Sequence, residues 1–377
     1  MNVEIGKNIK QKEGFFSFIP NSFPPNGIFA FPQTVLLKTA KADRLVGKLD
    51  GITHTLPDVD FFLSMFVAKD ATSSAQIEGT KATFVDAIEK EIGVATKETD
   101  ADDILHYIRA LHYGIKRLDD FPLSLRLIRE IHSQLMTGAR ASHYSDPGKF
   151  RKSQNWIGGT LPANALFVPP PVNTMKKALN DFEKFLHDEK NILPLLHIGL
   201  MHSQFETIHP FLDGNGRTGR LLISMLLCHR NMLERPVLFL SSYFKKHQKV
   251  YYQKLNDYHG GDIKSWIDFF LDGVIETANN SIAVSKNITK LREEDMAKIQ
   301  ALAKRESESG VLVLQKLYKQ PIVSTKIIMK WTSFSRAGSQ KVIDRFVNLG
   351  ILQQKNQKET YDKTYLYRRY INIFLQS

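Results

Sequence analysis

The chain has 377 residues, of which 42% are hydrophobic and 24% charged, and its 51 basic and 39 acidic side chains give a formal net charge of +12. This length predicts two or three domains, and the hydrophobic content excludes a mainly disordered chain. The single cysteine, Cys228, excludes disulfides within the chain. It follows an apolar run, so we interpret it as a small core residue in a reducing compartment.

The sequence shows no membrane-directed segment. Residues 1–7 lack the apolar region of a secretory signal peptide, and no uninterrupted apolar run reaches membrane-spanning length. We therefore expect a soluble, cytoplasmic protein with no membrane partner.

The N-terminal third divides into an arm and a helical region. Residues 15–33 are rich in phenylalanine and proline, which is typical of an extended arm that lies on another surface of the protein. From about residue 35 to 115 the apolar residues follow helical spacing, as in Phe62, Met65 and Phe66. We assign residues 1–115 to a mainly helical N-terminal extension.

Residues 116–290 contain further helical patterns and one predicted hairpin. Residues 155–159 and 165–171 are short apolar stretches joined by a turn bounded by glycine and proline, a pattern that predicts two paired strands. We assign the whole segment to a catalytic core.

Three histidines of this core do not have the spacing of a metal site. His197, His202 and His209 are separated by five and seven residues, whereas two histidines of a helical zinc site are four apart. We therefore interpret His197 and His202 as structural.

The most informative stretch is residues 209–220, which places a histidine, an aspartate, a Gly-Asn-Gly turn and two arginines within twelve residues. Gly214 and Gly216 permit positive φ angles and close backbone approach, so successive N–H groups can converge on an anion. The apolar run at residues 221–227 places this turn at the start of a buried helix, where the helix dipole also favours negative charge. The turn is therefore a candidate phosphate-binding loop.

The charged residues around this turn fit phosphate chemistry. Arg217 and Arg220 are three apart, and arginine can donate two parallel hydrogen bonds to a phosphate. Asp213 is the one acidic residue of the stretch, and Mg²⁺ usually takes one or two carboxylates and completes its shell with water and phosphate oxygens. His209, with an ordinary pKa of about 6.5, can accept a proton near neutral pH.

Two common nucleotide-binding classes are not supported. The chain has no G-x-x-x-x-G-K-[ST] segment and no G-x-G-x-x-G after a predicted strand. Residues 209–220 instead match the pattern H-P-F-x-[DE]-G-N-G-R-x-x-R at every defined position, and in this the chain resembles the Fic-domain family.

The resemblance implies a mainly α fold, with an all-helical Fic core and a small β-hairpin flap. It also implies transfer of a nucleotide monophosphate, usually AMP from ATP, to a hydroxyl of a target protein. In this assignment His209 deprotonates the target side chain and Asp213 binds Mg²⁺. Nucleotide contacts are implied for eight consecutive residues: Asp213, Gly214, Asn215, Gly216, Arg217, Thr218, Gly219 and Arg220.

Two further segments extend this resemblance. The predicted hairpin resembles the family's flap, which holds a target segment by strand-like pairing. It adds four residues to the expected nucleotide site: Asn155, Trp156, Ile157 and Gly158. Tyr251 resembles a tyrosine near the family's adenosine pocket, and it fits a core aromatic residue equally well.

Residues 74–79, Ser-Ala-Gln-Ile-Glu-Gly, resemble the family's inhibitory pattern [S/T]-x-x-x-E-[G/N]. Ser74 and Glu78 are four apart and share a helix face. The hypothesis is that Glu78 pairs with Arg220 and occupies the place that the γ-phosphate needs. The alternative is a solvated glutamate at a helix end that Gly79 caps. In some members of this class the same glutamate also supports removal of AMP from the modified protein.

Residues 291–377 differ in character, with 16 basic and 8 acidic side chains. Three helical patterns, at 311–318, 322–331 and 335–349, precede two short apolar stretches around a polar turn, which resembles a winged helix-turn-helix. Four side chains of its third helix could meet phosphates and base edges of DNA: Arg336, Gln340, Lys341 and Arg345. Winged helices also serve as protein-docking modules, so both alternatives stay open.

The sequence as a whole favours a protein adenylyltransferase that uses ATP and Mg²⁺ and that Glu78 inhibits. One alternative is transfer of another nucleotide monophosphate. Another is a DNA-binding regulator with an idle Fic core, although such a core is expected to have lost His209, Asp213 or an arginine. The modified residue of the target, Ser, Thr or Tyr, stays open, and the family resemblance is compatible with a homodimer.

Overall fold

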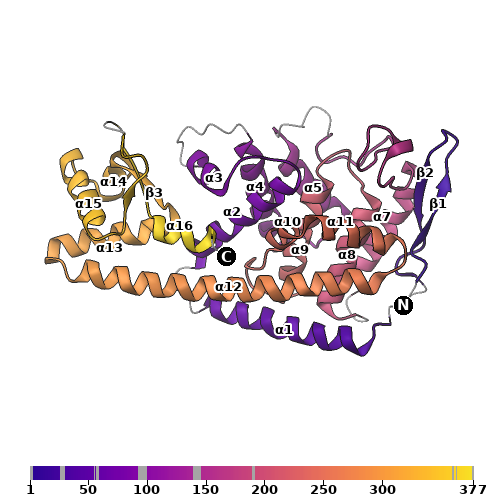
Figure 1. Ribbon diagram of the computed structural model, residues 1–377, viewed down its shortest axis with the longest axis horizontal. Helices are drawn as coiled ribbons and strands as arrows, with labels where there is room; N and C mark the ends of the chain where they lie inside the picture. Colours follow the sequence, from indigo (N-terminus) through magenta and orange to yellow (C-terminus); the bar gives the residue numbers. More distant parts are fainter. Residues whose placement is uncertain are drawn as a thin grey trace.

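The computed structural model describes residues 3–25, 30–54, 56, 59–91, 100–138, 146–188, 192–358, 361 and 363–375. The protein is mainly helical, as predicted (Figure 1). Its helices are α1 (Gln33–His54), α2 (Val59–Ile77), α3 (Phe84–Glu91), α4 (Ala101–Leu118), α5 (Leu125–Met136), η2 (Pro162–Asn164), α7 (Val172–Leu186), α8 (Pro194–Ile208), α9 (Asn215–His229), α10 (Ser241–Lys246), α11 (Gln248–His259), α12 (Ile263–Gln300), α13 (Lys304–Lys319), α14 (Thr325–Thr332), α15 (Arg336–Asn348) and α16 (Arg368–Leu375). Its strands are β1 (Gly6–Lys10), β2 (Phe16–Pro20), β3 (Ile322–Ser324), β4 (Gln353–Gln354) and β5 (Thr364–Leu366).

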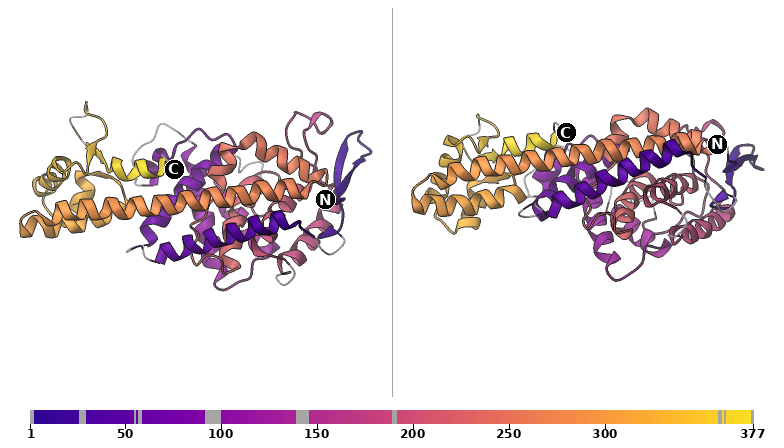
Figure 2. Two further views of the ribbon diagram at one scale, coloured as in Figure 1. Left: turned by 60° about the horizontal axis from the view of Figure 1, so that its bottom comes forward. Right: turned by 90° about the horizontal axis from the view of Figure 1, so that it is seen from below.

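Two long helices, α1 and α12, run side by side along the molecule, and both views of Figure 2 show them adjacent. Lys38 of α1 pairs with Asp268 at 3.4 Å and with Asp272 at 2.9 Å, both on α12. The 38 residues of α12 include many charged side chains. Within the described part of the chain, no helix is both long and apolar enough to cross a membrane.

The phenylalanine-rich arm forms part of a β-hairpin at the N-terminus. Strand β2 pairs antiparallel with β1, and the Phe18 N–H also donates to the Val168 carbonyl at 2.8 Å. The buried Phe18 ring lies against Phe167 and His259, with ring centroids 5.9 and 5.1 Å apart. The arm therefore lies on the base of the predicted flap, as its aromatic content indicated. Residues 26–29 of the predicted arm lie outside the described residues.

Helices α8 and α9 form the centre of the core. Every residue of α8 from Leu195 to Ile208 is buried, which is the pattern of a helix surrounded by other helices. Gly199 allows α12 to approach closely, since a Cβ atom there would lie 2.9 Å from the Phe270 ring. The Trp266 indole N–H of α12 donates to the Gly199 carbonyl at 2.8 Å. This packing holds α8 against α12, and His209 directly follows the end of α8.

Residues 304–375, which we call the C-terminal module, contain three helices, three short strands and the final helix α16. The strands form an antiparallel sheet in the order β3-β5-β4. Buried Asp295 of α12 accepts hydrogen bonds from Tyr367 at 2.8 Å and Arg369 at 2.7 Å. Phe374 of α16 contacts Phe66 of α2 at a centroid distance of 5.3 Å. The module is therefore tied both to α12 and to the helix that carries Ser74.

One predicted element of this module was wrong in part. The helical pattern predicted for 322–331 begins with strand β3, and the helix starts only at Thr325. Ile322 and Val323 are β-branched and pair with β5, so sheet formation overrides the helical spacing. The boundary that we expected at residue 290 lies inside α12, which continues to Gln300.

Candidate active site

His209 lies directly after α8 in a left-handed conformation, with φ of 48°. Its Nδ1 atom lies 3.3 Å from the Glu206 backbone carbonyl, which can only accept a hydrogen bond. This contact assigns the proton to Nδ1 and leaves the Nε2 lone pair for a substrate. Burial lowers the pKa of His209 to about 4. The imidazole is therefore neutral at pH 7 and can accept a proton.

Buried side chains hold the backbone around His209. Arg151 donates from Nε to the His209 carbonyl at 3.0 Å, and Asn155 donates to the Phe211 carbonyl at 2.8 Å. The Asn215 side chain accepts from the Phe211 N–H and donates to the Phe211 carbonyl, both at 2.8 Å. Asn155 and Asn215 therefore support the loop rather than present their amides to a nucleotide. The nucleotide contact expected for Asn155 stays a prediction.

His132 of α5 is a supporting residue that the sequence did not reveal. Its ring stacks on Phe211 at 3.7 Å, and its Nε2–H donates to the Asp213 carbonyl at 2.9 Å. The Gly148 N–H donates to the other ring nitrogen at 2.9 Å. Burial lowers the pKa of His132 to about 4, so the ring stays neutral. A single histidine in an amphipathic helix gives no sequence signal for this role.

The glycine turn leads into α9 as predicted. Gly214 has φ of 77° and immediately precedes the helix. A Cβ atom on Gly216 would lie 2.5 Å from a carboxylate oxygen of Glu78. The Glu78 carboxylate thus lies against the first turn of α9, where the helix dipole favours an anion.

Arg220 joins the inhibitory segment to the loop. It is buried and donates from Nε to the Ser74 hydroxyl at 2.8 Å and from Nη2 to the Glu78 carboxylate at 2.7 Å. Burial opposes both charges, but the pair overcomes it: Arg220 lowers the pKa of Glu78, and Glu78 raises that of Arg220. Gly79 follows with φ of 92°, so Glu78 both ends the helix region and forms the ion pair. The pairing of Glu78 with Arg220 and the helix end at Gly79, which the sequence offered as alternatives, therefore both occur in this segment.

Arg217 and Asp213 form the outer part of the loop. Arg217 Nη2 lies 3.5 Å from Asp213 Oδ2, and the buried Arg217 Nε has no hydrogen-bond partner among the described residues. Asp213 keeps 44% of its side chain exposed. An unsatisfied guanidinium N–H beside an accessible carboxylate fits a phosphate and its Mg²⁺ ion. No group of three or more histidine, cysteine, aspartate or glutamate side chains that could hold a metal ion occurs in the described ranges.

The predicted flap is present as a single antiparallel bridge between Ile157 and Phe167. The Ile157 N–H donates to the Phe167 carbonyl at 2.8 Å, and the Phe167 N–H donates back to the Ile157 carbonyl. Three apolar side chains of the flap region are exposed: Trp156 (37%), Leu161 (61%) and Leu166 (83%). Such a surface can accept an extended segment of another protein.

Three residues of the expected nucleotide set lie in the core. The Thr218 hydroxyl donates to the Gly214 carbonyl at 2.8 Å, and Gly219 packs against Glu206. Tyr251 is 1% exposed, and its hydroxyl hydrogen-bonds His202 at 2.8 Å. The burial of Tyr251 fits its core alternative, and the nucleotide contacts of all three residues stay predictions. Its neighbour Tyr252 has the exposed ring.

Both histidines that we interpreted as structural lie in the core. His202 donates from Nδ1 to the Gly219 carbonyl at 3.1 Å, and His197 contacts the Phe185 carbonyl at 2.7 Å. Burial lowers the pKa of His202 to about 3. Their hydrogen bonds tie α8 to α9 and α7.

Glu206 is a second residue that sequence reasoning missed. It is buried one turn before His209, and its Oε2 atom lies 3.8 Å from His209 Nδ1. Its Oε1 atom has no partner in the described part of the chain. Burial raises the pKa of Glu206 to about 8, so the carboxyl group is largely protonated at neutral pH. A glutamate in an otherwise apolar helix is the signal that could have identified it.

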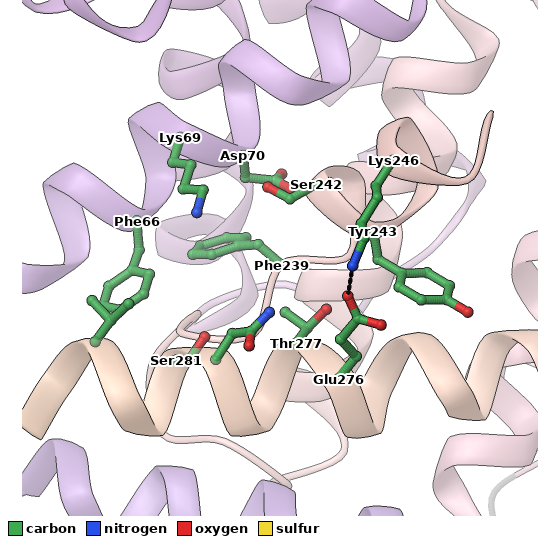
Figure 3. Close-up of a pocket in the computed structure, with 12 residues that line it drawn as sticks. Phe66, Lys69, Asp70, Phe239, Ser242, Tyr243, Lys246, Glu276, Thr277 and Ser281 are labelled. Carbon is green, nitrogen blue, oxygen red and sulfur yellow. Dashed lines mark hydrogen bonds and ion pairs between the residues drawn. The ribbon is translucent and has the colours of Figure 1, made fainter. Parts of the chain in front are cut away.

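A separate cavity of about 200 Å³ lies between α2, α10 and α12 (Figure 3). Lys246 and Glu276 form an ion pair at 2.7 Å on its wall. Asp70 of α2 also lines it and accepts hydrogen bonds from Tyr107 and from the Ser241 N–H. None of its lining residues belongs to the loop at 209–220 or to the flap, so this cavity is distinct from the candidate active site.

Two regions of the chain match known family descriptions. The description Fic/DOC family N-terminal matches residues 36–116, and Fic/DOC family matches residues 122–227. Protein adenylyltransferase Fic of Aedes aegypti is 30% identical over 214 residues, which cover 55% of this chain and 38% of that protein. The Drosophila grimshawi protein of the same name is 28% identical over 249 residues, covering 63% and 46%. The matched regions span less than half the length of these curated relatives.

Solved structures show the same fold. A Fic family protein from Desulfovibrio desulfuricans has a TM-score of 0.58 and 16% identity, and the match covers 90% of this chain and 97% of that chain. A Fic domain-containing signaling protein from Bacteroides thetaiotaomicron has a TM-score of 0.51 and 17% identity, covering 67% and 96%. The likeness to the first protein extends over most of this chain.

Proposed function

The chain belongs to the Fic/DOC family, and from this premise we propose that it is a protein adenylyltransferase that transfers AMP from ATP to a hydroxyl group of a target protein. One observation carries the proposal. A neutral, partly buried His209 and a helix start that suits an anion lie on one loop, and buried Arg217 and Arg220 follow within the first two turns of α9.

The chemistry follows from the positions of these groups. The His209 Nε2 atom accepts the proton of the target hydroxyl as the hydroxyl oxygen attacks the α-phosphorus of ATP. A new oxygen–phosphorus bond forms, the bond to the β-phosphate oxygen breaks, and pyrophosphate leaves. Backbone N–H groups of the first turn of α9 and the Arg217 guanidinium stabilise the negative charge on the phosphates. Mg²⁺ bound to Asp213 would neutralise part of the same charge.

The flap supports a protein as the acceptor. Leu161 and Leu166 expose apolar side chains beside a backbone bridge, so an extended target segment can pair with the strand and bury these side chains. The target's hydroxyl group would then lie beside His209. Phe18 of the N-terminal hairpin supports the base of the flap through its backbone hydrogen bond to the Val168 carbonyl.

Glu78 supports an inhibited ground state for this activity. Its carboxylate occupies the first turn of α9 and engages Arg220 at 2.7 Å, so a nucleotide phosphate and Glu78 compete for the same guanidinium. Displacement of Glu78 leaves Arg220 free to bind the terminal phosphate. In the same position Glu78 could direct water at an AMP-protein bond, and AMP removal is part of the proposal.

The test uses the purified protein with ATP labelled at the α-phosphate, Mg²⁺ and a cell lysate. We expect label on protein to rise in Glu78→Gly and to disappear in Glu78→Gly/His209→Ala. ATP labelled at the γ-phosphate should leave no label, which distinguishes AMP transfer from phosphorylation. Mass spectrometry of the labelled bands identifies the target and the modified Ser, Thr or Tyr.

Labelled nucleotides other than ATP test the first alternative, which is transfer of another nucleotide monophosphate. Label from GTP, CTP or UTP that exceeds label from ATP in Glu78→Gly would assign another nucleotide monophosphate. No label from any of them in a folded variant would favour the idle-core regulator. The same proposal includes a cytoplasmic location, a homodimer and the division of the chain into residues 1–115, 116–290 and 291–377. Helix α12 links the last two of these segments.

A further inference from the structure

The separate cavity between α2, α10 and α12 has no part in the proposed AMP transfer, and its lining combines apolar and polar side chains. Its volume is about 200 Å³. Pockets for drug-sized ligands usually measure about 300–1,000 Å³, so this cavity suits a smaller molecule. A lining of both kinds can orient a ligand that has one apolar end and one polar end.

Aromatic side chains form the apolar part of the lining. Phe66, Phe239 and Tyr243 line the cavity, and none of them is more than 9% exposed. The Phe66 ring is held by its edge-to-face contact with Phe374, and Tyr243 lies 5.1 Å from the Phe269 ring. Aromatic rings attract one another at centroid separations of about 4.5–7 Å. These side chains therefore favour a ligand with an aromatic ring over an aliphatic one.

The uncharged polar part of the lining comes from one face of α12. Thr277, Asn280 and Ser281 line the cavity, and their spacing of three and four residues places them on the same side of the helix. Their hydroxyl and amide groups can both donate and accept hydrogen bonds. This face can hold the polar end of a ligand, but it does not select the charge of that end.

The carboxylates of the lining do not select a cationic ligand. Asp70 is buried, and it accepts hydrogen bonds from the Tyr107 hydroxyl at 2.7 Å and from the Ser241 N–H at 3.0 Å. Glu276 is paired with Lys246 at 2.7 Å. Both carboxylates are therefore engaged by groups of the protein itself.

Lys69 of α2 gives the cavity its preference for an anion. Figure 3 shows its ammonium group directed into the cavity. Lys69 also has an interaction within the protein, but an ammonium group carries three N–H donors and can serve an internal partner and a bound carboxylate together. Burial lowers the pKa of Lys69 to about 8, so a carboxylate beside it would stabilise its charged form.

We propose that this cavity binds a small aromatic carboxylate, with the ring of the ligand against Phe66 and Phe239 and its carboxylate group on Lys69. Thr277 and Asn280 of α12 offer further hydrogen bonds to polar groups of the same ligand. An aliphatic acid would lose the ring contacts, and an aromatic amine would place a positive charge beside the Lys69 ammonium group.

The position of the cavity connects such a ligand to the inhibitory segment. Asp70 precedes Ser74 by about one turn of α2. The Ser73 hydroxyl lies 3.1 Å from the Ser242 hydroxyl of α10, so α2 and α10 are joined at this level. A ligand that contacts α2, α10 and α12 together should hold α2 where Ser74 and Glu78 engage Arg220. This consequence rests on the proposed function, whereas the binding itself does not.

The experiment measures binding to the full chain by isothermal titration calorimetry with three probes of similar size: phenylacetate, phenylacetamide and phenethylamine. We expect phenylacetate to bind at least about tenfold more tightly than the neutral phenylacetamide, because only the carboxylate gains a charge-assisted hydrogen bond. The cationic phenethylamine should bind more weakly than either.

Lys69→Met keeps the length of the side chain and removes its charge, so it should abolish the preference for phenylacetate over phenylacetamide. The matched control is Lys286→Met, at an exposed position of α12 outside the cavity lining. It should change the affinity for phenylacetate less than about twofold. Circular dichroism and the melting temperature verify that both variants fold.

AMP transfer gives a second measurement. At about ten times its dissociation constant, a ligand that binds only the inhibited position of α2 lowers the population of the released position about tenfold. Phenylacetate should therefore slow AMP transfer by the wild type by up to this factor. The Glu78→Gly variant should not respond, because it lacks the inhibitory carboxylate.

Three results would overturn the proposed site: absence of phenylacetate binding to the folded wild type, equal affinity for the acid and the amide, and an unchanged preference in Lys69→Met. Phenylacetate binding without any change in the wild-type rate would overturn the link to inhibition. If Glu78→Gly shows no AMP transfer at all, the proposed function fails, and calorimetry still decides whether the cavity binds the carboxylate.

Discussion

Helices α9 and α15 both begin with an arginine-bearing turn, but the two turns differ in burial. Arg217 and Arg220 of α9 are 6% and 3% exposed, and Arg220 is already paired with Glu78. Arg336 of α15 is exposed. The comparison teaches that burial decides how an arginine at a helix start is controlled. A buried arginine depends on its partner within the chain, whereas the charge of an exposed one is screened by salt.

The largest expected effect tests the buried region. His209→Ala in the Glu78→Gly background should lower AMP transfer by about 10² to 10⁴, the range for loss of a general base. The measurement is initial rate with α-labelled ATP. His132→Ala is not a suitable control because it supports the loop, so His187→Ala, at the end of α7, serves instead. A residual rate above one tenth of the parent would place the base elsewhere.

Acid should weaken the buried region before the exposed module. Burial lowers the pKa of His132 and His209 to about 4 and that of His202 and His259 to about 3. The unfolded chain takes up these protons near pH 6.5 and the folded chain does not, so stability is present above pH 6.5 and is lost as the pH falls toward 4.

In that window, each of these histidines lowers the free energy of unfolding by about 1.4 kcal/mol for each unit that the pH falls. Glu206 acts in the opposite sense, because burial raises its pKa to about 8. Its effect on the free energy of unfolding offsets that of about one of the four histidines. The expected net loss between pH 6.5 and 5 is a few kcal/mol, measured by urea unfolding. Residues 291–377 contain no histidine. Equal stability at both pH values would contradict the assignment of neutral buried histidines.

The next largest expected effect on the rate comes from releasing Arg220 from Glu78. Glu78→Gly should raise the rate of AMP transfer about 10- to 100-fold, because a charge-assisted hydrogen bond of about 1.5–3 kcal/mol no longer holds the guanidinium. Glu78→Gln keeps the size of the side chain and removes its charge, so its rate should lie between those of the wild type and the glycine variant. Glu276→Gln, at the ion pair beside the separate cavity, is the matched control. An unchanged rate in Glu78→Gly would refute inhibition by this residue.

Salt should give the smallest effect at the buried site and thus the sharpest contrast. Between about 50 and 200 mM salt, AMP transfer by Glu78→Gly should change less than about threefold, because salt screens buried charges less than exposed ones. The measurement is the initial rate with α-labelled ATP at each salt concentration. A rate that falls about tenfold or more would mean that Arg217 and Arg220 act as exposed cations.

Local patterns in the sequence predicted much of the site, and long-range packing set the rest. The spacing of residues 209–220 predicted the turn and the helix after it, because glycine and arginine have few other reasons to occur in that order. The pairing of Glu78 with Arg220 was expected only from the family resemblance of residues 74–79. The roles of His132 and Arg151 could not be predicted. Each meets the loop through backbone carbonyls from a distant part of the chain, and any carbonyl in the sequence is an equal candidate.

The same division applies to the other expected site residues. The packing of α8 against α9 and α11 buries the side chains of Tyr251 and Thr218, which local patterns do not specify. Arg345 belonged to a basic helix face, and only the position of α13 placed Glu306 beside it.

By itself, the sequence determined the helical class and the glycine turn that leads into α9, since these depend on local backbone geometry and side-chain chemistry. The tertiary structure alone decided which charges are buried. Burial lowers the pKa of His209 and fixes Arg220 against Ser74, and it leaves Arg336 in solvent. Desolvation depends on every neighbour that excludes water from a group, and those neighbours come from elements far apart in the chain.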